Sequence, residues 1–134
     1  MYVAEIQRAM KNKNRIWVCR KDQLAEGDYI PIEVVYANEP SSVVVFRYNG
    51  NCLAYRNLCV HMPRRLDCEK DMIFDDTCAN LRCSMHGIIY DPITGEPLSD
   101  ICKGKKLTPI KIHENEEGIW ILDKRVKPLA ETST

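Results

Sequence analysis

Two short clusters of cysteine and histidine constrain this chain more than any other feature. The first is Cys59-Val60-His61 and the second is Cys83-Ser84-Met85-His86-Gly87, and only one of the three histidines lies outside them. Each cluster supplies one thiolate and one imidazole, and its short spacer lets both side chains of a tight loop point the same way. Two such loops can close on one metal centre from opposite sides, so the fold must bring them together.

The residues around the clusters narrow the choice of metal. Zinc is one alternative, because zinc sites commonly use pairs of cysteine and histidine with short gaps. The second cluster, however, continues as Ile88-Ile-Tyr90-Asp91-Pro-Ile-Thr94-Gly95, and a hairpin-like run over 43–55 leads into the first. In these stretches the chain resembles the Rieske family, in which two histidines replace two cysteines on one iron of a [2Fe–2S] centre. The resemblance covers about residues 16–122.

The resemblance implies one Rieske-type [2Fe–2S] cluster per chain, held by four ligands. Cys59 and Cys83 would hold the inner iron, and His61 and His86 the outer iron near solvent. Neutral imidazoles in place of thiolates make such a centre easier to reduce, with potentials of roughly −150 to +300 mV against about −400 mV for all-thiolate ferredoxins. A loop that shields the cluster is expected at residues 102–109.

Two features depart from the common pattern of the family. Twenty-one residues separate His61 from Cys83, more than is usual, and the excess falls in residues 67–76. The respiratory type joins its ligand loops by a disulfide, but Arg64 and Met85 stand at those positions. The chain is therefore similar to the soluble Rieske-type ferredoxins and to the Rieske domains of oxygenases, whose potentials tend to lie low in the Rieske range.

Composition agrees with a small soluble protein. With 134 residues, 45% of them hydrophobic, the chain can bury one core of its own. Nineteen basic residues balance nineteen acidic ones, which gives no reason to expect binding to nucleic acid or to an anionic membrane. No apolar run is long enough to span a bilayer, and the N-terminus lacks the apolar core of a signal peptide. We therefore expect a cytoplasmic protein.

Five of the seven cysteines lie outside the ligand clusters. An odd total in a chain without an export signal indicates reduced thiols. Cys19 and Cys52 fall in strand-like runs, where cysteine acts as a small buried hydrophobe. Cys68 and Cys78, in the extra stretch between the ligand loops, could pair or bind a second metal, and Cys102 is expected to fill space.

Short apolar runs separated by turns predict an all-β fold, a Rieske-like antiparallel sandwich or barrel with two cluster-binding loops. Asn49-Gly50 predicts a tight hairpin. The expected domain spans residues 15–123, its cluster-binding region lies at about 57–109, and polar tails occupy 1–14 and 124–134. We expect strands at 15–19, 30–36, 42–48, 52–56, 81–82, 88–90, 107–113 and 119–122, with a turn or short helix at 22–26.

Electron transfer is the function that the resemblance implies: a soluble ferredoxin that passes one electron from a reductase to an oxygenase or another terminal redox enzyme. Rieske oxygenases work at a separate iron held by two histidines and a carboxylate, which His113 alone cannot supply. No glycine-rich nucleotide fingerprint is present, so we expect no independent catalysis. A small subunit of a larger redox enzyme, such as nitrite reductase, and a zinc-stabilised interaction module are the alternatives.

Basic residues near the ligands predict where a partner would dock. They would favour an acidic partner surface by steering encounter. Solvated loop charge is the alternative interpretation. The candidates are Arg64, Arg65, Lys103, Lys105 and Lys106.

Overall fold

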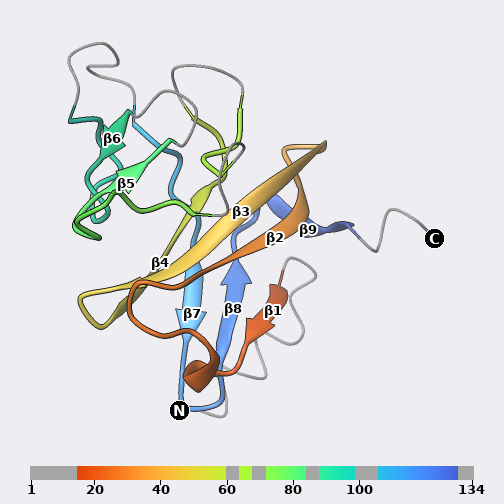
Figure 1. The fold of residues 1–134 in the computed structure, drawn as a ribbon. Helices are drawn as coiled ribbons and strands as arrows, with labels where there is room; N and C mark the ends of the chain where they lie inside the picture. The colour runs from red at the N-terminus through yellow and green to blue at the C-terminus, as the bar shows by residue number, and fades with distance from the viewer. Residues whose placement is uncertain (1–14, 60–63, 68–71, 84–87, 99–105, 130–134) are drawn as a thin grey trace.

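Strands make up almost all the regular structure of the protein. The computed structural model describes residues 15–59, 64–67, 72–83, 88–98 and 106–129 (Figure 1). In chain order its elements are β1 (Arg15–Cys19), the 3-10 helix η1 (Lys21–Gln23), β2 (Tyr29–Tyr36), β3 (Glu39–Tyr48), β4 (Asn51–Arg56), β5 (Leu81–Arg82), β6 (Ile89–Tyr90), β7 (Ile112–Glu114), β8 (Ile119–Leu122) and β9 (Val126–Pro128). The all-β prediction is confirmed.

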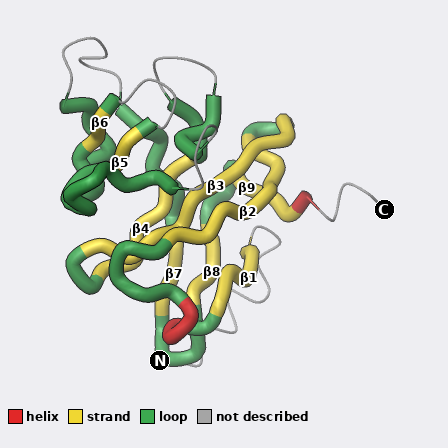
Figure 2. The backbone as a smooth tube through the Cα atoms, viewed as in Figure 1, coloured by secondary structure: helices red, strands yellow, loops and turns green. Residues whose placement is uncertain are grey.

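The described strands form three antiparallel sheets. Their orders are β4-β3-β2-β9, β1-β8-β7 and β5-β6. Figure 1 shows β5 and β6 at one end of the molecule and η1 at the other. Loops rather than strands make up most of the chain around β5 and β6 (Figure 2). Among the described residues, no helix has the length and apolar character needed to cross a bilayer.

The β3–β4 hairpin turns at Asn49-Gly50, as the sequence predicts. Both residues have positive φ, 52° and 79°, which is the geometry that favours this dipeptide in a two-residue turn. The carboxylate of Glu26 accepts hydrogen bonds from both their backbone N–H groups, at 2.6 and 2.8 Å. The hairpin therefore sends β4 directly toward the first cysteine of the motif.

Strand β3 separates two hydrophobic cores because successive side chains of a strand point to opposite faces. Val43 and Val45 join the core between the two larger sheets, together with residues of β2 and β8. Val44 and Phe46 face the other way and join the core that holds Cys59, Cys83 and the β5–β6 region. All four side chains are fully buried. The candidate site thus packs on the back of the main sheet.

One strand is shorter than the sequence predicts. The sequence pattern indicates a strand at 107–113, but β7 spans only Ile112–Glu114. The preceding residues run beside β4 instead: the Arg56 N–H donates to the Thr108 carbonyl at 2.9 Å, and the Ile110 N–H donates to the Ala54 carbonyl at 3.0 Å. Residues 107–113 therefore form backbone hydrogen bonds with two strands: the first part of the segment bonds to β4 and the last part pairs with β8.

The sequence predicts a polar tail at residues 124–134, and this prediction is wrong for the segment Val126–Pro128. These residues form β9, which pairs with β2 from Val34 to Tyr36. Val126 is fully buried, and the burial of this one apolar side chain stabilises the pairing of an otherwise polar segment with β2. Residues 1–14 and 130–134 lie outside the described residues.

Candidate metal centre

The first ligand loop starts where β4 ends. Cys59 is 2% exposed, and its N–H donates to the carbonyl of Arg64 at 2.7 Å. This bond closes the loop at its base and keeps the cysteine in the core. His61, the predicted partner ligand, lies outside the described residues.

The second ligand loop joins β5 to β6 and has the same closure. Cys83 is fully buried, and its N–H donates to the carbonyl of Ile88 at 2.9 Å. In both loops, then, the cysteine N–H bonds to the carbonyl five residues further on. The structure brings the two predicted cysteine ligands into one buried cluster. His86 lies outside the described residues.

Tyr90, on β6 just after the second ligand loop, contacts Cys59 of the first ligand loop. Its hydroxyl oxygen lies 3.2 Å from the Sγ of Cys59, and the side chain is fully buried. A metal-bound thiolate can only accept, so the hydroxyl would donate to it. The sequence pattern includes this tyrosine but assigns it no role, because the contact joins residues 31 positions apart.

Asn57 connects β4, β3 and the far side of the first loop. Its side-chain oxygen accepts from the N–H of Leu66 at 2.8 Å, and its Nδ2 donates to Asp67 at 3.0 Å and to the Ser42 hydroxyl at 3.3 Å. The asparagine is 2% exposed, so these bonds replace nearly all its contact with water. Nothing in the sequence pattern points to this role.

Strand β2 holds the exit of the first loop, residues 64–67, at two points. The guanidinium of Arg65 makes two hydrogen bonds to the carboxylate of Glu33, at 2.7 and 2.8 Å, and this bonding raises the pKa of the arginine. The hydroxyl of Tyr29 donates to Asp67 at 3.0 Å. Within the proposed basic rim Arg64, Arg65 and Lys106 are all exposed, and Arg65 is paired with Glu33. Lys103 and Lys105 lie outside the described residues.

The turn after β6, residues 91–95, packs against Tyr55 of β4 and so positions the strand that follows the second loop. Tyr55 donates from its hydroxyl to the carbonyl of Pro92 at 2.8 Å. Burial raises the pKa of Tyr55 to about 12, and the nearby charge of Asp91 adds to the effect. Gly95 has φ of 77°, and a Cβ there would lie 2.8 Å from the Tyr55 ring. Only glycine fits this turn without moving the tyrosine.

The extra segment between the loops ends inside the same core. Ile73 is fully buried, and its carbonyl accepts from the N–H of Arg82 at 2.7 Å. Phe74 forms a bridge with Leu81, so the end of the segment lies along β5. Cys78 is exposed and carries a free thiol. Cys68 and Cys102 lie outside the described residues.

The remaining described cysteines act as small apolar side chains. Cys19 is buried and Cys52 half-buried, and both pack in the core between the larger sheets. Burial raises the pKa of Cys19 and raises that of Cys52 to about 12. At neutral pH both thiols are protonated, which suits packing rather than metal binding.

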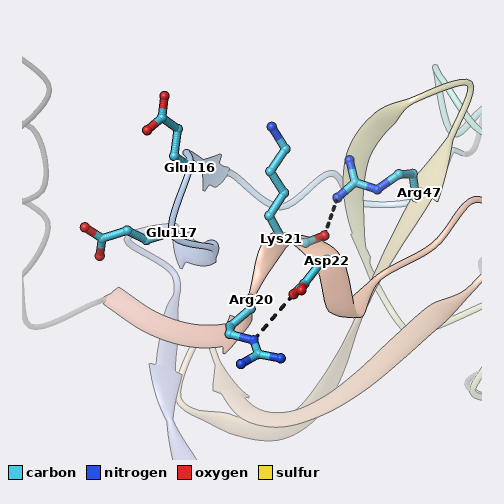
Figure 3. Close-up of a pocket in the computed structure, with 6 residues that line it drawn as sticks. All are labelled: Arg20, Lys21, Asp22, Arg47, Glu116 and Glu117. Carbon is cyan, nitrogen blue, oxygen red and sulfur yellow. Dashed lines mark hydrogen bonds and ion pairs between the residues drawn. The ribbon is translucent and has the colours of Figure 1, made fainter.

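A pocket of about 700 Å³ lies beside η1 (Figure 3), at the end of the molecule opposite β5 and β6 (Figure 1). Its lining consists of Arg20, Lys21, Asp22, Arg47, Glu116 and Glu117. Two interactions cross its wall: an ion pair of 3.4 Å joins Arg20 to Asp22, and Arg47 donates to the carbonyl of Lys21 at 3.4 Å. Its lining includes neither cysteine nor histidine, so it offers no alternative position for an iron–sulfur cluster.

The described residues suit a cofactor with anionic sulfur at its centre. Two buried thiols stand at the roots of two closed loops, and a hydroxyl is directed at one of them. Such an arrangement would keep thiolates away from water and provide a hydrogen-bond donor that stabilises their negative charge. An iron–sulfur cluster meets both conditions.

Solved structures show where else this fold occurs. A ferredoxin of carbazole 1,9a-dioxygenase from Nocardioides aromaticivorans IC177 matches with a TM-score of 0.63 at 22% identity, over 83% of this chain and 99% of that one. A complex of reduced oxygenase and oxidized ferredoxin of carbazole 1,9a-dioxygenase contains a chain that matches with a TM-score of 0.67 at 21% identity, over 85% and 97%. The reduced complex between oxygenase and ferredoxin in carbazole 1,9a-dioxygenase contains a longer chain that also matches. The match has a TM-score of 0.65 at 17% identity and covers 82% of this chain and 28% of the longer one.

The family follows from the sequence match rather than from these distant structures. No curated protein matches the chain. The model of the family described as Rieske [2Fe-2S] domain matches residues 14–113, which include both ligand loops and most of the two larger sheets. The architecture and the match agree, and the chain belongs to the Rieske [2Fe–2S] domain family.

Proposed function

We propose that this chain is a one-electron carrier, a Rieske-type ferredoxin that passes electrons from a reductase to an oxygenase or another terminal redox enzyme in the cytoplasm. The observation that carries the proposal is the pair of buried cysteines at the roots of two closed loops, within a family that binds a [2Fe–2S] cluster. When bound, such a cluster takes up and releases one electron.

We assign the four ligands to Cys59, His61, Cys83 and His86. The family's cofactor argues against the zinc alternative. The two cysteines hold their places in the core through the backbone bonds that close each loop. The Tyr90 hydroxyl would donate to the metal-bound sulfur of Cys59, and Asn57 fixes the far side of the first loop by accepting from the N–H of Leu66. We also propose that the domain comprises residues 15–123, with β9 added to its main sheet, and that its cluster-binding region is 57–109.

Removal of either cysteine ligand tests the assignment. We expect Cys59→Ala and Cys83→Ala to lose the red-brown chromophore and to unfold at lower temperature, because the remaining ligands cannot hold the cluster. Cys78→Ala, an exposed thiol, is the matched control and should keep a wild-type absorption spectrum. A normal cluster in the Cys83→Ala protein would refute the ligand set.

A small subunit of a larger redox enzyme is the second candidate. It is favoured by one observation, that the fold also matches 28% of a longer chain in an oxygenase complex. Purification of the native protein from its host decides between the two. A ferredoxin elutes at its own mass, whereas a subunit elutes with its enzyme.

A further inference from the structure

We propose that Asp67 lowers the reduction potential of the centre by holding a negative charge beside the first ligand loop. The inference rests on the proposed function, because it concerns the same centre. It assigns to Asp67 the role of setting how readily the centre accepts its electron.

The carboxylate of Asp67 is held in place at both oxygens. Tyr29 donates to Oδ2 and Asn57 donates to Oδ1, each at 3.0 Å. Both donors are neutral, so they fix the charge without cancelling it. Asn57 stands two residues before Cys59 and also binds the N–H of Leu66, so the carboxylate is tied directly to the loop that carries the ligand.

Among the groups bonded to one another at the loop exit, the charges do not balance, and the second cation there, Arg64, is exposed to water. Two carboxylates, Glu33 and Asp67, surround one guanidinium, that of Arg65. Arg65 gives two hydrogen bonds to Glu33, at 2.7 and 2.8 Å. Within this group of three, Asp67 has only a weaker, through-space attraction to Arg65, so Glu33, Arg65 and Asp67 together keep one negative charge.

A fixed negative charge makes the addition of an electron less favourable. Coulomb interaction with the reduced centre raises its energy more than that of the oxidised one, so the potential falls. Asp67 is half-buried, which leaves the interaction stronger than at an open surface and still sensitive to salt. Removal of the charge should therefore raise the potential, most clearly at low ionic strength.

The decisive variant is Asp67→Asn. Its amide oxygen can still accept from Asn57, and its amide N–H can donate to the hydroxyl of Tyr29, so both hydrogen bonds survive while the charge is lost. We expect a higher midpoint potential by spectroelectrochemistry, with an unchanged absorption spectrum and melting temperature. Asp76→Asn removes an exposed carboxylate from the same inter-loop segment and should leave the potential at the wild-type value.

Two further variants separate charge from structure. Asp67→Ala loses charge and hydrogen bonds together, so its potential should also rise while its melting temperature falls. Asp67→Glu restores the charge and should bring the potential back toward wild type. A wild-type potential in both the Asn and Ala variants, with only lower stability in the latter, would show that Asp67 is a structural clamp.

The experiment also separates this inference from the proposed function. If the wild-type protein, after reconstitution with iron and sulfide, shows no Rieske spectrum, the proposed function fails. If the spectrum is present but the potential ignores the charge at residue 67, only the role of Asp67 is refuted.

Discussion

The hydroxyl of Tyr90 is placed to change the properties of the centre. It lies 3.2 Å from the Sγ of Cys59 in a fully buried position. A donor to a cluster sulfur stabilises the added negative charge of the reduced state. We expect Tyr90→Phe to keep the cluster but to lower its midpoint potential, measured by spectroelectrochemistry. An unchanged potential would mean that the hydroxyl does not donate to this sulfur.

The expected shifts in reduction potential have opposite signs at Tyr90 and Asp67, so the two variants together test more than either one alone. Loss of the tyrosine hydroxyl should lower the potential, and loss of the aspartate charge should raise it. General loosening of the site would move both variants the same way. The double variant should lie between the two single ones, because Tyr90 acts from β6 and Asp67 from the exit of the first loop, and independent contributions add.

Asp123 gives the stability of the protein a dependence on pH. Its carboxylate is 3% exposed and accepts from the N–H of Lys111 and from the backbone and guanidinium of Arg125, and these bonds hold its pKa far below the usual range. A depressed carboxyl pKa stabilises the folded state above the unfolded pKa of about 3.9. The benefit is lost as the pH falls from there toward the folded pKa.

The variant Asp123→Asn should therefore melt well below wild type at pH 7. A loss of about 2 to 3 kcal/mol is expected, since the buried, charged acceptor of several hydrogen bonds is replaced. The gap in melting temperature should narrow as the pH is lowered from about 5 to about 2, by calorimetry. A gap that stays constant over this range would contradict the role given to the ionised carboxylate.

At the scale of elements, the turn after β6 depends on one glycine. Gly95 has φ of 77° and meets the Tyr55 ring, whereas Gly50 has φ of 79° and a Cβ placed there would meet no atom within 4 Å. Gly50→Ala should cost about 1 to 2 kcal/mol, from backbone strain alone. Gly95→Ala adds a clash of roughly 1 to 3 kcal/mol. Chemical denaturation measures both, and equal losses would contradict the contact with Tyr55.

The sequence predicts elements well where a local pattern determines them. The strand at Arg15–Cys19 and the Asn49-Gly50 turn are confirmed because alternation and turn chemistry are encoded within a few residues. The division of residues 107–113 between β4 and β8 depends on distant partners. Strand β9 depends on the burial of Val126 within a polar segment. No short window of sequence contains that information.

The candidate site shows the same division between motif and support. The two cysteines follow from the motif, and the structure buries both. The roles of Tyr90, Asn57 and Asp67 do not, because each acts through residues that are distant in the chain or on another strand. A motif specifies ligands, whereas the fold specifies what surrounds them.

At the scale of the whole molecule, the structure separates two arginines that the sequence treats alike. Arg64 is exposed, whereas Arg65 is paired with Glu33 on β2. We expect Arg64→Glu to slow reduction by the native reductase at low salt, with an unchanged absorption spectrum and stability, because charge steering acts on encounter. Stopped-flow kinetics measures the rate.

Arg65→Glu is the comparison for this prediction. It replaces an exposed ion pair by a repulsion, so it should lower stability by about 1 kcal/mol. If Arg64→Glu transfers electrons at the wild-type rate at low salt, Arg64 is solvated loop charge and the docking surface lies elsewhere.

The bonds from Cys59 to Arg64 and from Cys83 to Ile88 make each ligand loop a ring closed within itself. Among the described residues, neither closing bond involves the stretch between the two loops. The chain between the rings can therefore lengthen over evolutionary time without disturbing either one, as long as Leu66 and Asp67 still reach Asn57 and Ile73 still reaches Arg82. Its surface can diversify for new partners or new controls while the redox chemistry is inherited unchanged.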